Sequence, residues 1–180
     1  FFERNLKANM PGARLTSLEI MPENVLDASI PLHAVMEFTA DGMIATGSGK
    51  AIVSLPWVGK NFGIINFILN GTGLEQRKYP LLTQFACGLQ EKVSIKLGAG
   101  FTGAVSMPAC KPVDDQAVGY HEQVKFADHT LNATRGLMLK IVEFSPKQYL
   151  KLKQTLKLLN YDARKTPVLV ISGERVAATD

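Results

Sequence analysis

Residues 89–96 read LQEKVSIK, and the alternation within this stretch decides the class of the fold. Val93 and Ile95 alternate with Lys92 and Lys96, so apolar side chains would point to one face of an extended chain and charged ones to the other. This two-residue period predicts a half-buried β-strand. Similar apolar runs recur at roughly 10–15-residue spacing, with Gly, Pro and Asp between them, which favours a mainly β protein built as an antiparallel β-sandwich.

The other strands are expected where apolar residues alternate or cluster between turn-forming residues. They are expected at residues 30–39, 43–46, 50–55, 62–69, 77–84, 101–106, 119–127, 130–134, 135–144 and 167–172. Asp41-Gly42 separates the first two runs and predicts a hairpin turn, because both residues tolerate a positive φ. Residues 15–21 would add a strand near the N-terminus, and we expect about 9–11 strands in all.

One α-helix is expected near the C-terminus. Ser145 is a good N-cap, Pro146 suits the first helical position, and residues 147–159 contain no helix breaker. Four apolar residues recur at helical spacing and would form one buried face: Tyr149, Leu152, Leu156 and Leu159. The sequence therefore predicts a helix at about residues 146–159, followed by a closing strand.

Length and composition restrict the class of protein. A chain of 180 residues, 46% hydrophobic and 20% charged, is ordinary for a globular protein and long enough to bury a core. We expect residues 1–26 to be a lead-in with at most one strand, and residues 27–180 to form a single β-sandwich domain. The chain begins without Met, so we expect a processed or excised piece. The longest apolar stretches, such as 62–69, are much shorter than the roughly 20 residues of a membrane-spanning helix.

The net charge of +4 is concentrated in one segment. Residues 145–165 hold six basic side chains and one acidic side chain, whereas the rest of the chain is close to neutral. Lysines beside or opposite a leucine face are typical of a solvated surface helix. The charge therefore does not indicate nucleic-acid binding. At most it would form a face for an acidic partner, with Lys151 and Lys153 as the candidate contacts.

No motif for a metal or a nucleotide cofactor is present. Gly47-Ser48-Gly49-Lys50 lacks the other residues of a phosphate-binding loop, so we expect a turn between two strands. The three histidines, His33, His121 and His129, do not have the spacing of metal ligands. We therefore expect no cofactor and no metal.

The candidates for catalysis are also weak. Neither Cys87 nor Cys110 opens a recognisable helix that would lower the pKa of its thiol, so we expect two buried thiols or one disulfide between them. Asp114 and Asp115 lie in a loop, where paired acids usually form turns, and Glu122 is the third acid considered for acid–base catalysis. We predict that this chain contains no catalytic residue.

The aromatic residues offer an alternative, a binding surface. Trp57, the single tryptophan, lies in a predicted loop and could stack on a sugar, or its ring could pack over one end of the core. Exposed together on one face, Trp57, Tyr79 and Tyr120 would mark a module that binds glycan, cell-wall peptide or protein.

The order of short motifs between residues 74 and 172 resembles a known domain. The motifs are Arg77-Lys78-Tyr79-Pro80-Leu81, Val93-Ser94-Ile95-Lys96-Leu97 with Gly98 and Gly100, Met107-Pro108, Gly119-Tyr120, Arg135-Gly136-Leu137-Met138-Leu139, Phe144-Ser145-Pro146-Lys147-Gln148-Tyr149 and Val168-Leu169-Val170-Ile171. Together they resemble the C-terminal β-sandwich domain, a family of unknown function, that follows transglutaminase-like domains in extracytoplasmic proteins of Bacteroidetes. Leu97 is not followed by the proline that this family carries there.

The resemblance implies a role rather than an active site. The Cys-His-Asp triad of those proteins belongs to the transglutaminase-like domain, and nothing in this chain matches it. The resemblance implies a non-catalytic accessory domain, periplasmic or surface-located, that packs against the adjacent catalytic domain or presents substrate to it. The alternative implied by the aromatic residues is a module that binds glycan, cell wall or protein.

Overall fold

The computed structural model describes residues 2–27, 29–59, 72–83 and 85–172. The chain forms two compact units, Phe1–Met43 and Ile44–Asp180. The described residues are mainly β, and all of their strand pairs are antiparallel. A helix lies near the C-terminus, so the predicted fold class is confirmed. No described helix is long and apolar enough to cross a membrane.

The first unit consists of a helix and a two-stranded sheet. Helix α1 spans Phe2–Asn9, and strand β1 (Arg14–Met21) pairs with β2 (His33–Thr39). Leu6 is fully buried in this unit. The β1–β2 pairing joins residues on both sides of position 26, and the unit extends to Met43.

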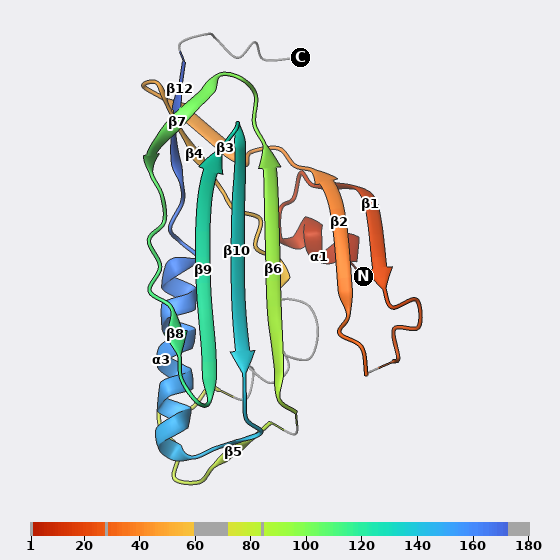
Figure 1. Cartoon of the computed structure of the whole chain (residues 1–180), viewed down its shortest axis with the longest axis vertical. Coiled ribbons are helices and arrows are strands. Elements are labelled where there is room, and N and C mark those ends of the chain that lie inside the picture. Colours follow the sequence, from red (N-terminus) through yellow and green to blue (C-terminus); the bar gives the residue numbers. More distant parts are fainter. Residues whose placement is uncertain (1, 28, 60–71, 84, 173–180) are drawn as a thin grey trace. The chain divides into compact units, whose positions relative to one another are not determined.

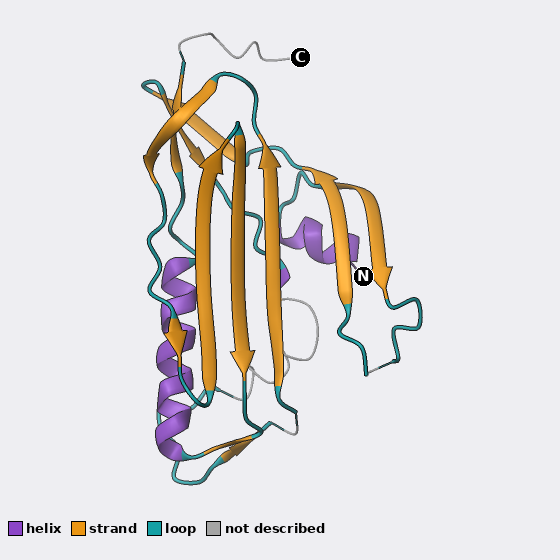
Figure 2. Cartoon of the chain, viewed as in Figure 1, coloured by secondary structure: helices purple, strands orange, loops and turns teal. Residues whose placement is uncertain are grey.

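The second unit contains two four-stranded sheets and a long helix (Figures 1 and 2). The main sheet has the order β6 (Cys87–Lys96), β10 (Thr130–Leu139), β9 (Val118–Ala127) and β8 (Val113–Asp114). The second sheet has the order β3 (Ile44–Gly47), β4 (Lys50–Val53), β12 (Val168–Ile171) and β7 (Phe101–Ser106). A short ladder joins β5 (Leu81–Leu82) to β11 (Glu143–Phe144). Helix α3 spans Pro146–Asp162.

Helix α3 begins where the sequence predicts. Ser145 accepts a hydrogen bond from the backbone N–H of Gln148, and the Gln148 side chain accepts one from the N–H of Ser145, which is a capping box. Tyr149, Leu152 and Leu159 are buried, as their spacing indicates. The helix continues to Asp162, three residues beyond the expected end.

Two apolar clusters cover the inner face of the main sheet. Around α3 the cluster includes Tyr120, Leu137 and Leu152. Toward the second sheet the other cluster includes Val124, Leu131 and Leu169. One half of the sheet thus packs on a helix and the other half on a second sheet, so the structure is a sandwich over only part of its length.

Three predicted strands differ from the structure. Residues 130–134 and the first part of 135–144 form one continuous strand, β10, which ends at Leu139. Only Leu81–Leu82 of the expected strand 77–84 is in a ladder. The expected strand 62–69 lies outside the described residues.

The tight turns form where the local sequence predicts them, but the strands on either side of a turn do not always pair with each other. Ser48 and Gly49 have φ values of 50° and 70° and join β3 to β4 as the expected turn. Gly42 also has a positive φ, of 71°, yet the expected hairpin at Asp41-Gly42 is wrong, because β2 pairs with β1 and β3 pairs with β4.

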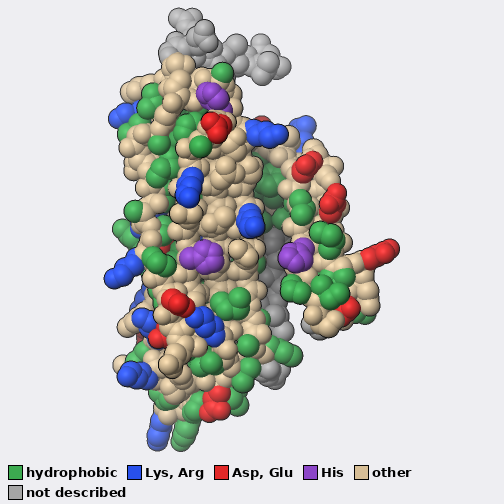
Figure 3. Space-filling model, in the orientation of Figure 1, with side chains coloured by type: hydrophobic (Ala, Val, Ile, Leu, Met, Phe, Trp, Pro, Cys, Tyr) green, Lys and Arg blue, Asp and Glu red, His purple; other side chains and the backbone are tan. Residues whose placement is uncertain are grey.

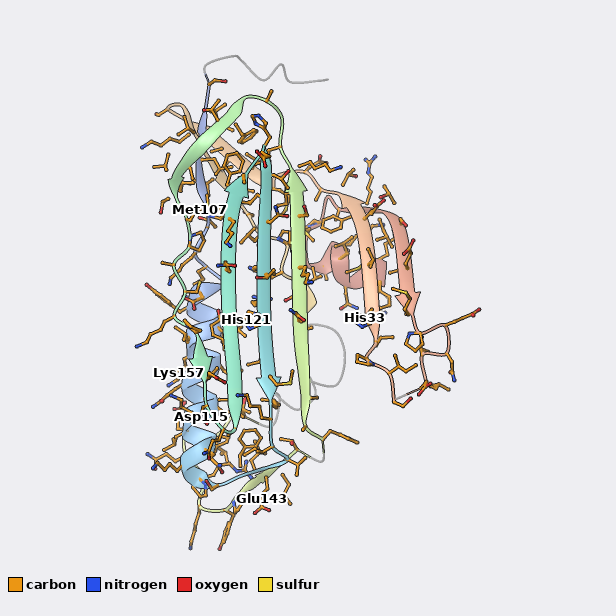
Figure 4. The ribbon with its side chains drawn as sticks, in the orientation of Figure 1. His33, Met107, Asp115, His121, Glu143 and Lys157 are labelled. Carbon is orange, nitrogen blue, oxygen red and sulfur yellow. The ribbon has the colours of Figure 1, made fainter. Side chains whose placement is uncertain are left out.

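The outer face of the main sheet is solvated and carries small residues. Figure 3 shows scattered basic side chains over this face, and Figure 4 places His121 in the middle of β9. The His121 ring lies over Gly136 on the neighbouring strand, where an added Cβ would lie 2.2 Å from the ring. A side chain at position 136 would therefore require the exposed His121 ring to move aside.

Candidate functional site

A row of three charged residues crosses the middle of the inner face of the main sheet. Arg135 on β10 pairs in register with Glu91 on β6 and with Glu122 on β9. Arg135 is 3% exposed and Glu122 is 7% exposed. The row separates the two apolar clusters. Buried charges are costly unless they are paired, so this row is the place where the fold departs from an apolar core, and we take it as the candidate site.

On one side of the row, Glu91 is fully engaged. Its Oε2 accepts hydrogen bonds from Nη2 (2.7 Å) and Nε (3.1 Å) of Arg135. Its Oε1 accepts from the backbone N–H groups of Val58 (3.0 Å) and Gly59 (2.5 Å). The Trp57 ring lies 4.5 Å from the Arg135 guanidinium, in a cation–π contact. These contacts hold the loop after β4 against the edge of the main sheet.

On the other side of the row, Glu122 belongs to a buried acidic group. The Tyr120 hydroxyl lies 3.3 Å from Oε2 of Glu122 and 3.2 Å from Oδ2 of Asp162. A hydroxyl has one proton, so it can donate to only one of these carboxyl groups at a time. Burial raises the pKa of Glu122, while Asp162 has an ion pair with Lys165 at 2.7 Å. With a proton on Glu122, its carboxyl group donates to the Tyr120 hydroxyl, which in turn donates to Asp162, and each contact then has one donor.

Two polar atoms of the row have no hydrogen-bond partner among the described residues. They are Nη1 of Arg135 and Oε1 of Glu122. An unsatisfied buried polar atom costs about 1–3 kcal/mol, which a structural core would ordinarily avoid.

A cavity lies next to the row. Its volume is about 290 Å³, and it lies between β6, β10 and α3. Four leucines form its apolar wall: Leu89, Leu137, Leu156 and Leu159. Arg135, Lys153 and Lys157 bring positive charge to it, and Figure 4 shows Lys157 on α3. The cavity therefore combines an apolar wall with basic groups.

The cysteines are not arranged for nucleophilic chemistry. Cys87 and Cys110 are both free, so the structure contains no disulfide between them. Burial raises the pKa of the Cys87 thiol. Burial, together with the negative charge of Glu122 and Asp162, raises the pKa of Cys110 to about 11. The protonated thiol is a poor nucleophile, so neither residue is activated at neutral pH.

In the described part of the chain, no three His, Cys, Asp or Glu residues are arranged so that they could hold a metal ion. His121 is on the outer face of the main sheet, and His33 is on β2 in the first unit. His129 lies in the β9–β10 turn, with Nδ1 2.9 Å from the Phe101 carbonyl oxygen. His121 and His129, which both lie in the second unit, are thus apart.

The three aromatic candidates do not form one exposed surface. Trp57 is half-buried beneath Arg135, and Tyr79 is 69% exposed. Tyr120 is 1% exposed, so the expected surface role of Tyr120 is wrong, and its ring packs in the cluster around α3. The parity of β9 explains this placement, since Tyr120 shares its inner face with Val118.

The two lysine candidates lie on α3 but have different surroundings. Lys153 donates to the Thr72 carbonyl oxygen (3.2 Å) and pairs with Glu75 at 3.4 Å, so its charge is engaged within the chain. Lys151 lies beside a second cavity, which Asp114 and Asp115 also line.

The residues that sequence reasoning missed are Glu91, Arg135 and Asp162. A signal was present in two of the three. Glu91 lies two residues before Val93, so both side chains point to the same face of their strand, and the same holds for Arg135 and Leu137. A charged residue on the apolar face of a strand indicates a buried pair. Which residue is its partner depends on strand pairing, which a single sequence does not show.

Comparison with known proteins supports the fold alone. No family model and no curated protein matches this sequence. The structure is similar to one described as "crystal structure of a putative protease from Parabacteroides distasonis", with a TM-score of 0.53 and 13% identity. The match covers 68% of this chain and 24% of that chain, so this chain spans about a quarter of the length of its structural neighbour.

Proposed function

We propose that this chain is a non-catalytic accessory domain of a longer extracytoplasmic protein, where it packs against a transglutaminase-like or cysteine-peptidase-like domain or presents substrate to it. The observation that carries the proposal is the structural similarity to about a quarter of a longer chain described as a "putative protease". The resemblance of the motifs between residues 74 and 172 supports the same role and is the basis for the extracytoplasmic location.

The state of the titratable groups supports a non-catalytic role. The two thiols have raised pKa values. Glu91 is engaged with Arg135, Glu122 with Tyr120, and Asp162 with Lys165. Catalysis by a cysteine needs a base within hydrogen-bond reach of the thiol. The nearest titratable partners of Cys110 are acids and a lysine, and they include no histidine.

A surface for the neighbouring domain is available at the β5–β11 end of the second unit. Leu82, Phe85 and Val142 are exposed there, at 68%, 52% and 45%. They lie close together because Thr83 donates from its backbone N–H to the Val142 carbonyl oxygen (2.9 Å) and from its hydroxyl to that of Phe85 (2.9 Å). We call these three residues the β5–β11 patch. Exposed apolar groups of this kind typically mark an interaction surface.

The first experiment tests for catalysis. The chain is incubated with peptide and isopeptide substrates, as wild type and as the Cys87→Ala and Cys110→Ala variants. We expect no turnover by any of them. Turnover by the wild type that is lost in either variant would show that this chain is itself an enzyme.

The second experiment tests the accessory role in the longer protein. Phe85→Glu places a charge in the β5–β11 patch and should weaken docking. We expect a lower turnover by the catalytic domain of the longer protein, or faster limited proteolysis of that protein. Val105→Glu is the matched control, because Val105 is 48% exposed and lies on β7 of the second sheet. Equal behaviour of wild type and both variants would contradict docking through this patch.

A further inference from the structure

The cavity between β6, β10 and α3 carries an excess of positive charge. Arg135, Lys153 and Lys157 line it, and Glu91 is the acid among the described lining residues. Glu91 is already engaged by Arg135 and by two backbone N–H groups. Arg135 is 3% exposed, and its Nη1 has no partner within the described chain. Nη1 is itself buried, so what Arg135 brings to the cavity is its positive charge.

The shape and lining of the cavity indicate the rest of the ligand. Four leucines form the wall, so the part of the ligand away from the charge would be apolar. A volume of about 290 Å³ equals that of roughly ten liquid waters, which suits a molecule of about ten non-hydrogen atoms. The largely apolar wall favours a singly charged carboxylate over a phosphate, which has more oxygens to satisfy.

We infer that this cavity binds a carboxylate carried on a compact apolar group. Lys153 supplies a charge-assisted hydrogen bond to the carboxylate, the positive charge of Arg135 attracts it, and the leucines enclose the apolar group. The proposed binding site rests on the cavity and its lining residues, and it does not depend on the proposed function. The source that we favour, the C-terminus of a peptide ending in an apolar residue, rests on the proposed function. A free short-chain carboxylic acid has the same chemistry.

Glu75 competes for the same lysines. Its carboxylate lies 3.4 Å from Lys153 and 3.7 Å from Lys157, and its side chain is 78% exposed. The charge of Lys153, followed by that of Lys157, lowers the pKa of Glu75. The lysines of the cavity therefore already hold an exposed carboxylate of the chain itself, which an incoming carboxylate can displace.

The test is a binding titration of the intact chain with matched probes. N-acetyl-L-leucine carries the carboxylate and N-acetyl-L-leucinamide lacks it, while hexanoate represents a free acid. By calorimetry or NMR shifts, the acid should bind at least tenfold more tightly than the amide. Lys153→Gln should weaken binding of the acid about tenfold, and Glu75→Gln should strengthen it severalfold. Lys147→Gln, an exposed site in the first turn of α3, is the control and should have no effect.

Opposite signs for two substitutions on one ion pair distinguish ligand binding from a general effect on folding. Arg135 stays unchanged in the test, because its removal would leave Glu91 buried without its partner. No binding of any probe, equal binding of acid and amide, or indifference to Lys153→Gln would overturn the inference. Binding of hexanoate without N-acetyl-L-leucine would overturn the peptide source. These outcomes are independent of the turnover assay that tests the proposed function.

Discussion

Two glutamates flank Arg135 at the same level of the main sheet, and they have different environments. Glu91 receives two hydrogen bonds from Arg135 and two from backbone N–H groups. Glu122 faces Tyr120 and the negative charge of Asp162, and one of its oxygens has no partner among the described residues. Both residues are glutamates in register with Arg135, so the elements that pack against them decide how they differ in hydrogen bonding and in pKa.

The comparison shows how a charged residue in a core acquires its role. The loop after β4 brings two N–H donors to Glu91, so this glutamate is the partner of the buried arginine. Helix α3 brings an acid to Glu122, and burial then raises the pKa of Glu122. One glutamate anchors a loop by its charge, and the other is favoured in its neutral form.

The largest expected effect is at Glu91. Glu91→Gln removes the charge that compensates Arg135, and breaking one partner of a buried pair costs about 3–5 kcal/mol. We expect the free energy of unfolding, measured by urea denaturation, to fall by that amount. Glu143→Gln, an exposed glutamate on β11, is the control and should change it little. If the free energy of unfolding fell by less than about 1 kcal/mol, Glu91 would not be the residue that compensates the buried charge of Arg135.

An intermediate effect is expected at Gly59. A Cβ at this position would lie 2.6 Å from Cδ of Glu91, so Gly59→Ala forces the carboxylate away from the backbone N–H groups. Overpacking of this kind costs about 1–3 kcal/mol. We expect a lower melting temperature together with a change in Trp57 fluorescence, because Trp57 packs on Arg135. Gly73→Ala, where a Cβ would meet nothing within 4 Å, is the matched control.

The smallest effect, and the opposite sign, is expected at Glu122. Because the folded-state pKa is raised, the folded chain holds this proton more tightly than the unfolded chain does. The contribution to stability is present below the unfolded pKa and is lost as pH rises through the folded pKa. Glu122→Gln keeps a hydrogen-bond donor without a charge, so it should equal wild type near pH 4 and be more stable near pH 8, on the order of 1 kcal/mol.

Urea denaturation at a series of pH values measures this difference. Lower stability of Glu122→Gln at pH 8 would contradict the comparison, since it would mean that ionised Glu122 serves Arg135 as Glu91 does.

Local patterns in the sequence account for much of the fold. The alternation in β6, β9 and β10 is strong because one face of each strand is buried, and the capping box of α3 is a contact between residues three apart. Asp41-Gly42 shows where such patterns fail. The turn forms with its positive φ, but β2 takes β1 as its partner, and strand partners depend on contacts distant in sequence.

The same division holds for the candidate site. Strand parity alone places Glu91, Arg135 and Glu122 on apolar faces, because successive side chains of a strand alternate. Their meeting in one row depends on the register of β6, β10 and β9, and the different states of the two glutamates depend on the β4 loop and on α3. Short stretches of sequence determine local backbone geometry, whereas the charge state of a buried group depends on neighbours that only the folded chain brings together.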